Sequence, residues 1–103
     1  MTIVNYKEFL KLAGARPIPD ELGKFDKPIT AAQKEMLHKM GIGFSDIDNR
    51  YKADIVLSVA NYRMKKGLAT PGQMRMLRKL GVSDVGKKTF EEASDIIGYS
   101  YYW

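Results

Sequence analysis

Three cations in one segment have the spacing of neighbours on one side of a helix. Arg75, Arg78 and Lys79 stand at positions i, i+3 and i+4. Guanidinium and ammonium groups arranged in this way can neutralise the backbone phosphates of a nucleic acid. We therefore predict a phosphate-binding surface at these residues. Little sequence preference is expected, because no base-reading motif accompanies the cations.

The positive charge of the chain is concentrated around this row. Residues 63–88 have eight basic side chains and one acidic side chain, a net charge of +7, whereas the whole chain has +5. The backbone amides at a helix start near Thr70 could also hold a phosphate oxygen. The predicted nucleic-acid-binding residues are Lys65, Lys66, Thr70, Arg75, Arg78, Lys79, Lys87 and Lys88. A solvated basic surface, or one that contacts an acidic protein, is the alternative.

The aromatic C-terminus, Y-S-Y-Y-W, allows two interpretations. Exposed Tyr102 and Trp103 beside a basic groove would stack on unpaired bases. Alternatively, Tyr99, Tyr102 and Trp103 would cover the core opposite the N-terminal helix, which is favoured because large aromatic side chains dominate small cores.

No set of residues in the sequence suggests catalysis. The chain has no cysteine, and its one histidine, His38, is expected on an exposed helix face beside Glu35 and Lys39. We therefore predict a non-enzymatic protein with no catalytic residues, no metal site and no cofactor. No apolar run approaches the roughly 20 residues of a membrane span, so we expect a cytoplasmic protein without membrane contact.

The elements that must position the cations come from an apparent duplication. Residues 29–42 read I-T-A-A-Q-K-E-M-L-H-K-M-G-I, and residues 69–82 read A-T-P-G-Q-M-R-M-L-R-K-L-G-V. In both copies a threonine followed three residues later by glutamine predicts a capping box, and a glycine predicts the helix end. A second helix should follow each copy, the later one capped by Thr89 and Glu92.

The sequence thus predicts a single all-α domain over residues 1–103, a small bundle of about five helices. Residues 1–28 should form an N-terminal helix, capped by Asn5 and Glu8, and a proline-rich connector pinned to the core by Ile18, Leu22 and Phe25. Residues 29–68 and 69–103 should form two repeated helix-turn-helix hairpins. No segment is predicted to be a strand.

Helical periodicity predicts which face of each hairpin helix is buried. For the first helices the expected buried residues are Met36, Leu37 and Met40, and then Met76, Leu77 and Leu80. For the second helices they are Tyr51, Ile55, Val59 and Tyr62, and then Phe90, Ala93, Ile97 and Tyr101.

The residues G-L-A-T-P-G-Q-M-R-M-L-R-K-L-G-V followed by T-F-E-E-A-S-D-I-I resemble the C-terminal accessory segments of superfamily II (DEAD/DEAH-like) helicases, notably those of bacteriophages. Those tails are similar in pairing a T-x-x-Q-x-x-x-L-x-x-x-G helix with an E-A-S-x-I-I helix, often twice. The resemblance covers residues 29–103, and the ATPase motor motifs are missing. It implies an accessory module from a phage or mobile element, with DNA contacts at Thr70, Arg75, Arg78 and Lys79.

Two functional hypotheses follow. The first is an accessory module that binds nucleic acid, DNA in preference to RNA, through backbone phosphates. The alternative is a small phage protein that binds a host nucleic-acid-processing complex and inhibits a nuclease or defence system, as anti-CRISPR proteins do. The sequence leaves the oligomeric state open.

Overall fold

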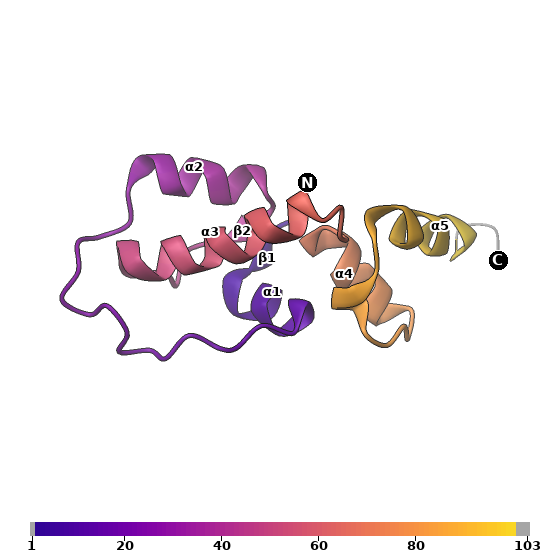
Figure 1. Cartoon of the computed structure of the whole chain (residues 1–103), viewed down its shortest axis with the longest axis horizontal. Coiled ribbons are helices and arrows are strands. Elements are labelled where there is room, and N and C mark those ends of the chain that lie inside the picture. Colours follow the sequence, from indigo (N-terminus) through magenta and orange to yellow (C-terminus); the bar gives the residue numbers. More distant parts are fainter. Residues whose placement is uncertain (1, 101–103) are drawn as a thin grey trace.

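The structure, a computed structural model, describes residues 2–100 of the chain. Within these residues it contains five α-helices, as predicted, together with one 3₁₀ helix and two short strands. In chain order they are β1 (Val4–Asn5), α1 (Tyr6–Ala13), α2 (Ala31–Lys39), β2 (Ile42–Gly43), α3 (Arg50–Lys65), α4 (Pro71–Lys79), the 3₁₀ helix η1 (Val85–Lys87) and α5 (Phe90–Ser100). The molecule measures 50 × 23 × 22 Å, with α2 and α3 toward one end and α5 at the other (Figure 1).

Three of the predicted capping boxes are present. In α2 and α4 the hydroxyl groups of Thr30 and Thr70 accept hydrogen bonds from the glutamine amides three residues later, at 3.0 and 3.1 Å. The glutamine side chains accept from the threonine amides in return. Thr89 and Glu92 do the same before α5, at 3.0 and 3.1 Å. These three helix starts are therefore confirmed. They could be predicted from the sequence because capping depends on neighbours within one turn.

Each hairpin contains the same kind of hydrogen bond between its two helices. The Nε2 atom of Gln33 in α2 donates to Oδ1 of Asp54 in α3 at 2.7 Å. The Nε2 atom of Gln73 in α4 donates to Oγ of Ser94 in α5 at 3.0 Å. Both pairs differ by forty positions between the copies, as a repeat would require, while the duplication itself stays a prediction.

The expectation that no strand forms was wrong, although the fold remains mostly helical. Val4 pairs with Ile42 and Asn5 with Gly43 in a parallel two-stranded sheet. The amide of Val4 also donates to the carbonyl of Gly41 at 2.8 Å. Both Val4 and Ile42 are buried, so the sheet holds the N-terminus against the first hairpin. Two residues are too few for an alternating sequence pattern to reveal a strand.

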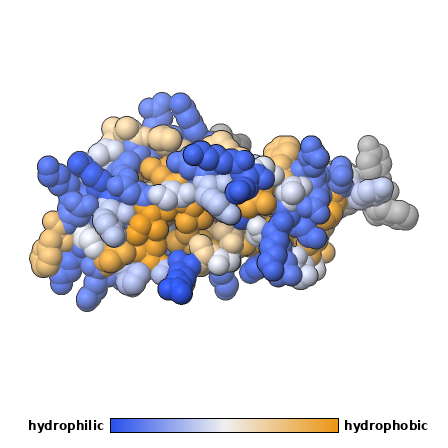
Figure 2. All heavy atoms as spheres, in the orientation of Figure 1, coloured by the Kyte–Doolittle hydropathy of each residue, from blue (hydrophilic) through white to orange (hydrophobic). Residues whose placement is uncertain are grey.

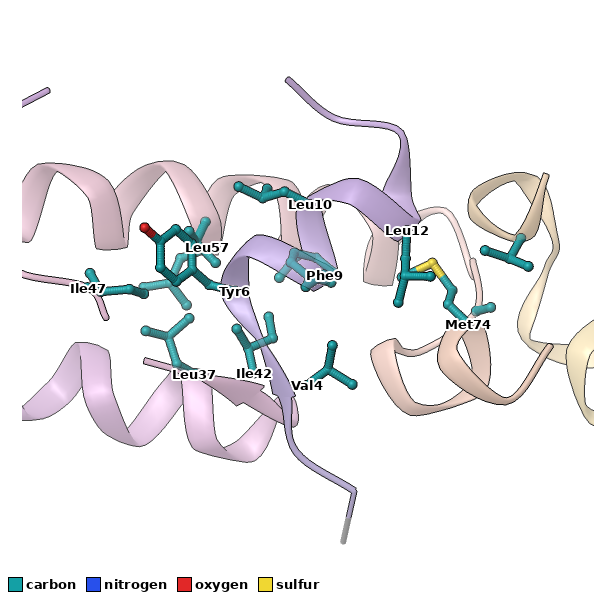
Figure 3. Close-up of a cluster of buried hydrophobic side chains, with 14 of the residues drawn as sticks. Val4, Tyr6, Phe9, Leu10, Leu12, Leu37, Ile42, Ile47, Leu57 and Met74 are labelled. Atoms are coloured by element: carbon teal, nitrogen blue, oxygen red, sulfur yellow. The ribbon is translucent and has the colours of Figure 1, made fainter. Parts of the chain in front are cut away.

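One hydrophobic core runs along the molecule. Figure 3 shows Tyr6 of α1 lying near Leu37, Ile47 and Leu57 between α2 and α3, whereas Leu12 lies beside Met74 of α4. The buried faces of α2 and α4 were only partly predicted. Leu37 and Leu77 are fully buried, whereas the expected core residues Met36, Met76 and Leu80 are exposed. In α4 the buried face is formed by Met74 and Leu77, three positions apart, and Leu80 already follows the last residue of the helix.

The predicted buried face of α3 was wrong by about one residue. Tyr51 and Tyr62 are exposed, while the neighbouring Lys52 and Arg63 are buried. Lysine and arginine have long apolar stems that can line a core while their charged groups reach polar partners, so residue type alone misled the prediction. In α5 the buried position Ala93 is confirmed, but Phe90 is exposed. Tyr101 lies outside the described residues.

Polar side chains at the start of α3 bind the backbone of the connector between α1 and α2. Nζ of Lys52 donates to the carbonyl of Asp20 at 2.6 Å, and Nδ2 of Asn49 donates to the carbonyl of Leu22 at 3.0 Å. Ile18 and Leu22 are half-buried, as expected of anchors, but Phe25 is 94% exposed and anchors nothing.

Hydrophobic residues reach the surface among hydrophilic ones in the middle of the molecule (Figure 2). Across residues 2–100, no helix combines the length and the apolar character needed to cross a membrane.

Candidate nucleic-acid interface

Helix α4 presents the predicted row of cations. Thr70 caps its start, Pro71 occupies its first turn, and Arg78 and Lys79 lie in its last turn. Arg78 and Lys79 are exposed, whereas Arg75 is half-buried. The row therefore exists, but its three members differ in how freely they can meet a ligand.

Arg75 already has an anionic partner inside the protein. Its Nε and one terminal nitrogen donate to the two carboxylate oxygens of Glu8 in α1, at 3.2 and 2.8 Å. This two-bond geometry is the stronger form of an arginine–carboxylate pair. The prediction that Glu8 caps α1 was therefore wrong. Asn5 accepts from the amide of Lys7 instead, and the Glu8 carboxylate stabilises the contact between α1 and α4.

Arg78 and Lys79 act on the same carboxylate. The hydrogen bond from Arg75 is the main cause that lowers the pKa of Glu8 from its usual 4.5, and the positive charges of Arg75, Lys79 and Arg78 lower it further. The carboxylate in turn raises the pKa of Arg75. Arg75 thus pairs directly with a partly exposed carboxylate, and Arg78 and Lys79 add to the positive field around it.

This ion pair predicts an acid-dependent loss of stability. Because the pKa of Glu8 is lower in the folded protein, its contribution is present above pH 4.5 and is lost as the pH falls through the lowered value. Replacement of Glu8 by glutamine should cost at most about 1 kcal/mol at neutral pH, since the pair is partly exposed to solvent. Urea unfolding of both proteins across the acid range should show the difference vanishing at low pH and shrinking at high salt. A difference that is constant with pH would contradict this account.

A second group of predicted residues gathers at the start of α4. The amide of Ala69 donates to the carbonyl of Lys88 at 2.9 Å, and the amide of Phe90 donates to the carbonyl of Gly67. These bonds bring the loop before α5 against the loop before α4. Lys88 is therefore one of the residues that join these two loops, and Thr70 lies next to another. Lys65 and Lys66 directly precede the loop before α4, at the end of α3. Thr70 uses its hydroxyl in the capping box. Lys87 is exposed on η1, which packs against α1 and α4.

Arg63 belongs to the basic segment but not to its surface. It is only 6% exposed, and its two terminal nitrogens donate to the carbonyls of Gly86 and Ala69, at 2.8 and 3.1 Å. Burial lowers its pKa from the ordinary arginine value. The sequence holds a signal for this position, because Arg63 continues the spacing of the buried residues Val56 and Ala60.

The aromatic C-terminus is described only up to residue 100. Tyr99 is 69% exposed, so the prediction that it covers the core was wrong. Tyr102 and Trp103 lie outside the described residues, and their stacking role stays a prediction.

His38 of α2 is the one histidine whose place the sequence predicted. His38 is exposed, as expected, and Lys39 pairs with Glu35 at 3.5 Å beside it. Among residues 2–100, no three histidine, cysteine, aspartate or glutamate side chains lie close enough together to hold a metal ion.

Comparison of the chain with protein-family models, with curated proteins and with solved structures finds no match. The resemblance to helicase accessory segments therefore remains an expectation drawn from the residues quoted above.

Proposed function

We propose that the protein is a non-enzymatic module that binds DNA through backbone phosphates. The observation that supports this most is the set of exposed cations from a single segment. Lys65, Lys66, Arg78, Lys79 and Lys87 are exposed, and none forms an ion pair with an acidic side chain in the described part of the chain. Arg75 plays a smaller part, because Glu8 occupies its guanidinium group.

Electrostatic binding of this kind makes a quantitative prediction. Anisotropy of labelled single-stranded and duplex DNA should show affinity that falls steeply between ~50 and ~200 mM salt, because each neutralised phosphate releases counterions. The double variant Arg78→Ala, Lys79→Ala should lose about tenfold or more in affinity and reduce the slope of log K against log salt by about two.

The connector offers a matched control. The variant Lys24→Ala, Lys27→Ala removes the same charge from exposed positions far along the chain from α4. It should bind DNA nearly as well as the parent protein. Equal losses in the two double variants would show that net charge alone drives binding, and not the surface around Arg78 and Lys79, which we call the α4 surface.

A protein partner is the second proposal. A basic surface can also dock on an acidic protein patch, and a phage-derived module could inhibit a host nuclease or defence complex in this way. Absence of DNA binding even at ~50 mM salt would reject the first proposal, because phosphate contacts are strongest there. One stoichiometric host protein, retained after nuclease treatment in a pull-down, would then support the second.

A further inference from the structure

A groove of about 670 Å³ opens where the two hairpins meet. Residues of α1, α2, α3, the loop before α4 and the starts of α4 and α5 line it. Its apolar side chains include Met36, Met40, Met64, Leu68 and Phe90, and these five residues define what we call the methionine groove. Met64 is 62% exposed, and Met36 and Phe90 are each about half-exposed. Several large apolar side chains thus face solvent at one place, which is typical of an interaction site.

The methionines suit a surface that must adapt to a partner. Methionine is unbranched and has three rotatable side-chain bonds, so it can repack against different apolar shapes at small cost. Both hairpins also contribute to the groove, because Met36 lies in α2 and Met40 directly follows that helix, while Phe90 begins α5. A bound segment would therefore contact both halves of the molecule.

The charge around the groove is entirely positive among its lining residues. Lys39 and Arg63 line it, and no aspartate or glutamate does. Thr70 and Pro71, at the positive end of the α4 dipole, line it as well. Lys39 also pairs with Glu35 of α2 at 3.5 Å, in a salt bridge whose two side chains are both largely exposed. The groove thus combines an apolar surface with two lining cations and a helix N-terminus, which together favour an anionic occupant.

Arg63 provides a second, independent indication of an anionic occupant. Its guanidinium group is more than nine-tenths buried, yet it bonds only to two neutral carbonyls, and its Nε has no hydrogen-bond partner among the described residues. A buried charge without an ionic partner is costly, and a nearby carboxylate reduces that cost. A partner with an acidic side chain would supply the missing charge.

We propose that the methionine groove binds an acidic amphipathic helix of a protein partner. Apolar side chains at positions i, i+3, i+4 and i+7 of that helix enter the groove. The carboxylates of the helix lie near the two lining cations, Lys39 and Arg63. A nucleic acid is a poor occupant, because most of the lining is apolar and only two of its side chains are cationic, whereas an acidic amphipathic helix uses both the apolar surface and the positive charge. This inference is independent of DNA binding by the α4 surface.

Methionine methyl resonances give a direct test on the full chain. The probe is a synthetic amphipathic helix of about 18 residues, or five turns, with leucines on one face and glutamates on the other. In protein labelled with ¹³C at the methionine methyl groups, the signals of Met36, Met40 and Met64 should shift on titration. Met76 is also exposed but does not line the groove, and Met74 is buried in the core, so both should stay in place.

Two matched comparisons separate the effect of charge from nonspecific hydrophobic binding. The same peptide with lysine in place of glutamate should bind at least tenfold more weakly. The variant Met64→Glu places a carboxylate in the groove at an exposed position and should reduce affinity about tenfold, whereas Met76→Glu should not. Thermal unfolding of both variants checks that they remain folded.

Three results would overturn the proposal. The first is no shift of the groove methionines at about 1 mM glutamate peptide, the limit of weak affinity. The second is equal binding of the lysine peptide. The third is shifts of the groove methionines that depend on protein concentration without peptide, since these would show that a second copy occupies the groove.

Discussion

Replacement of Leu37 or Leu77 by alanine is expected to lower the free energy of unfolding by about 2–5 kcal/mol in each case. Both side chains have 0% exposure and occupy equivalent places on α2 and α4. The loss combines the removed apolar contact with the cavity left behind, which a packed core fills only in part. Because a domain of this size has only about 5–15 kcal/mol of stability, either variant should be visibly destabilised in urea.

Leu80 supplies the control for this prediction. Leu80 directly follows the last residue of α4 and is 43% exposed. Leu80→Ala should therefore cost no more than about 1 kcal/mol. Circular dichroism during urea unfolding measures all three variants. Comparable losses for Leu77→Ala and Leu80→Ala would contradict the assignment of the α4 buried face.

The same experiment tests whether the two hairpins share a core. Leu37 and Leu77 belong to one continuous cluster of buried residues, together with side chains of α1. Each variant should therefore shift one cooperative transition of the whole chain. Two separate transitions, each sensitive to only one variant, would show that the hairpins fold independently.

Local features of this fold could be predicted from the sequence. The capping boxes at Thr30, Thr70 and Thr89 depend only on a residue three positions later, and all three are present. The helix ends before Gly41 and Gly81 are equally local, because each glycine adopts a positive φ, at 75° and 84°. Such features need no knowledge of what lies across the core.

Features that depend on distant partners were missed. Asn5 and Glu8 have the spacing of a capping box, but Glu8 pairs with Arg75, 67 positions away. The pairing of Val4 with Ile42 is likewise set by tertiary contact. In both cases a long-range partner determined the structure, and no local pattern records it.

The α4 surface and the methionine groove also differ in whether the sequence alone could indicate them. The basic character of the α4 surface follows from composition and helical spacing, so the sequence could indicate it. The methionine groove could not be predicted, because it depends on which face of each helix is left uncovered. Met36 was expected in the core, and its exposure follows from how α2 sits on α3.

Replacement of Gly86 by alanine should destabilise the protein by about 3 kcal/mol, since overpacking and a lost charged hydrogen bond each cost about 1–3 kcal/mol. An added Cβ would lie 2.7 Å from the carbonyl oxygen of Leu12 and 2.9 Å from backbone atoms of Ala13. These are backbone atoms at the end of α1, so no side chain can turn aside, and η1 must move away.

The displacement would also reach Arg63. The carbonyl of Gly86 accepts a hydrogen bond from its guanidinium group at 2.8 Å, and the Nε of the same group already has no partner among the described residues. Moving this carbonyl would leave a buried charge with one acceptor fewer. The cost of the substitution therefore exceeds that of the steric contact alone.

Gly98 provides a control of opposite sign. It lies within α5, and an added Cβ there meets no atom of the described residues within 4 Å, so Gly98→Ala should stabilise the protein by up to about 1 kcal/mol through helix propensity. Thermal and urea unfolding of both variants measure the two effects under identical conditions. If Gly86→Ala were neutral, the close packing of η1 on α1 would be wrong, and with it the backbone position that holds Arg63 beside the methionine groove.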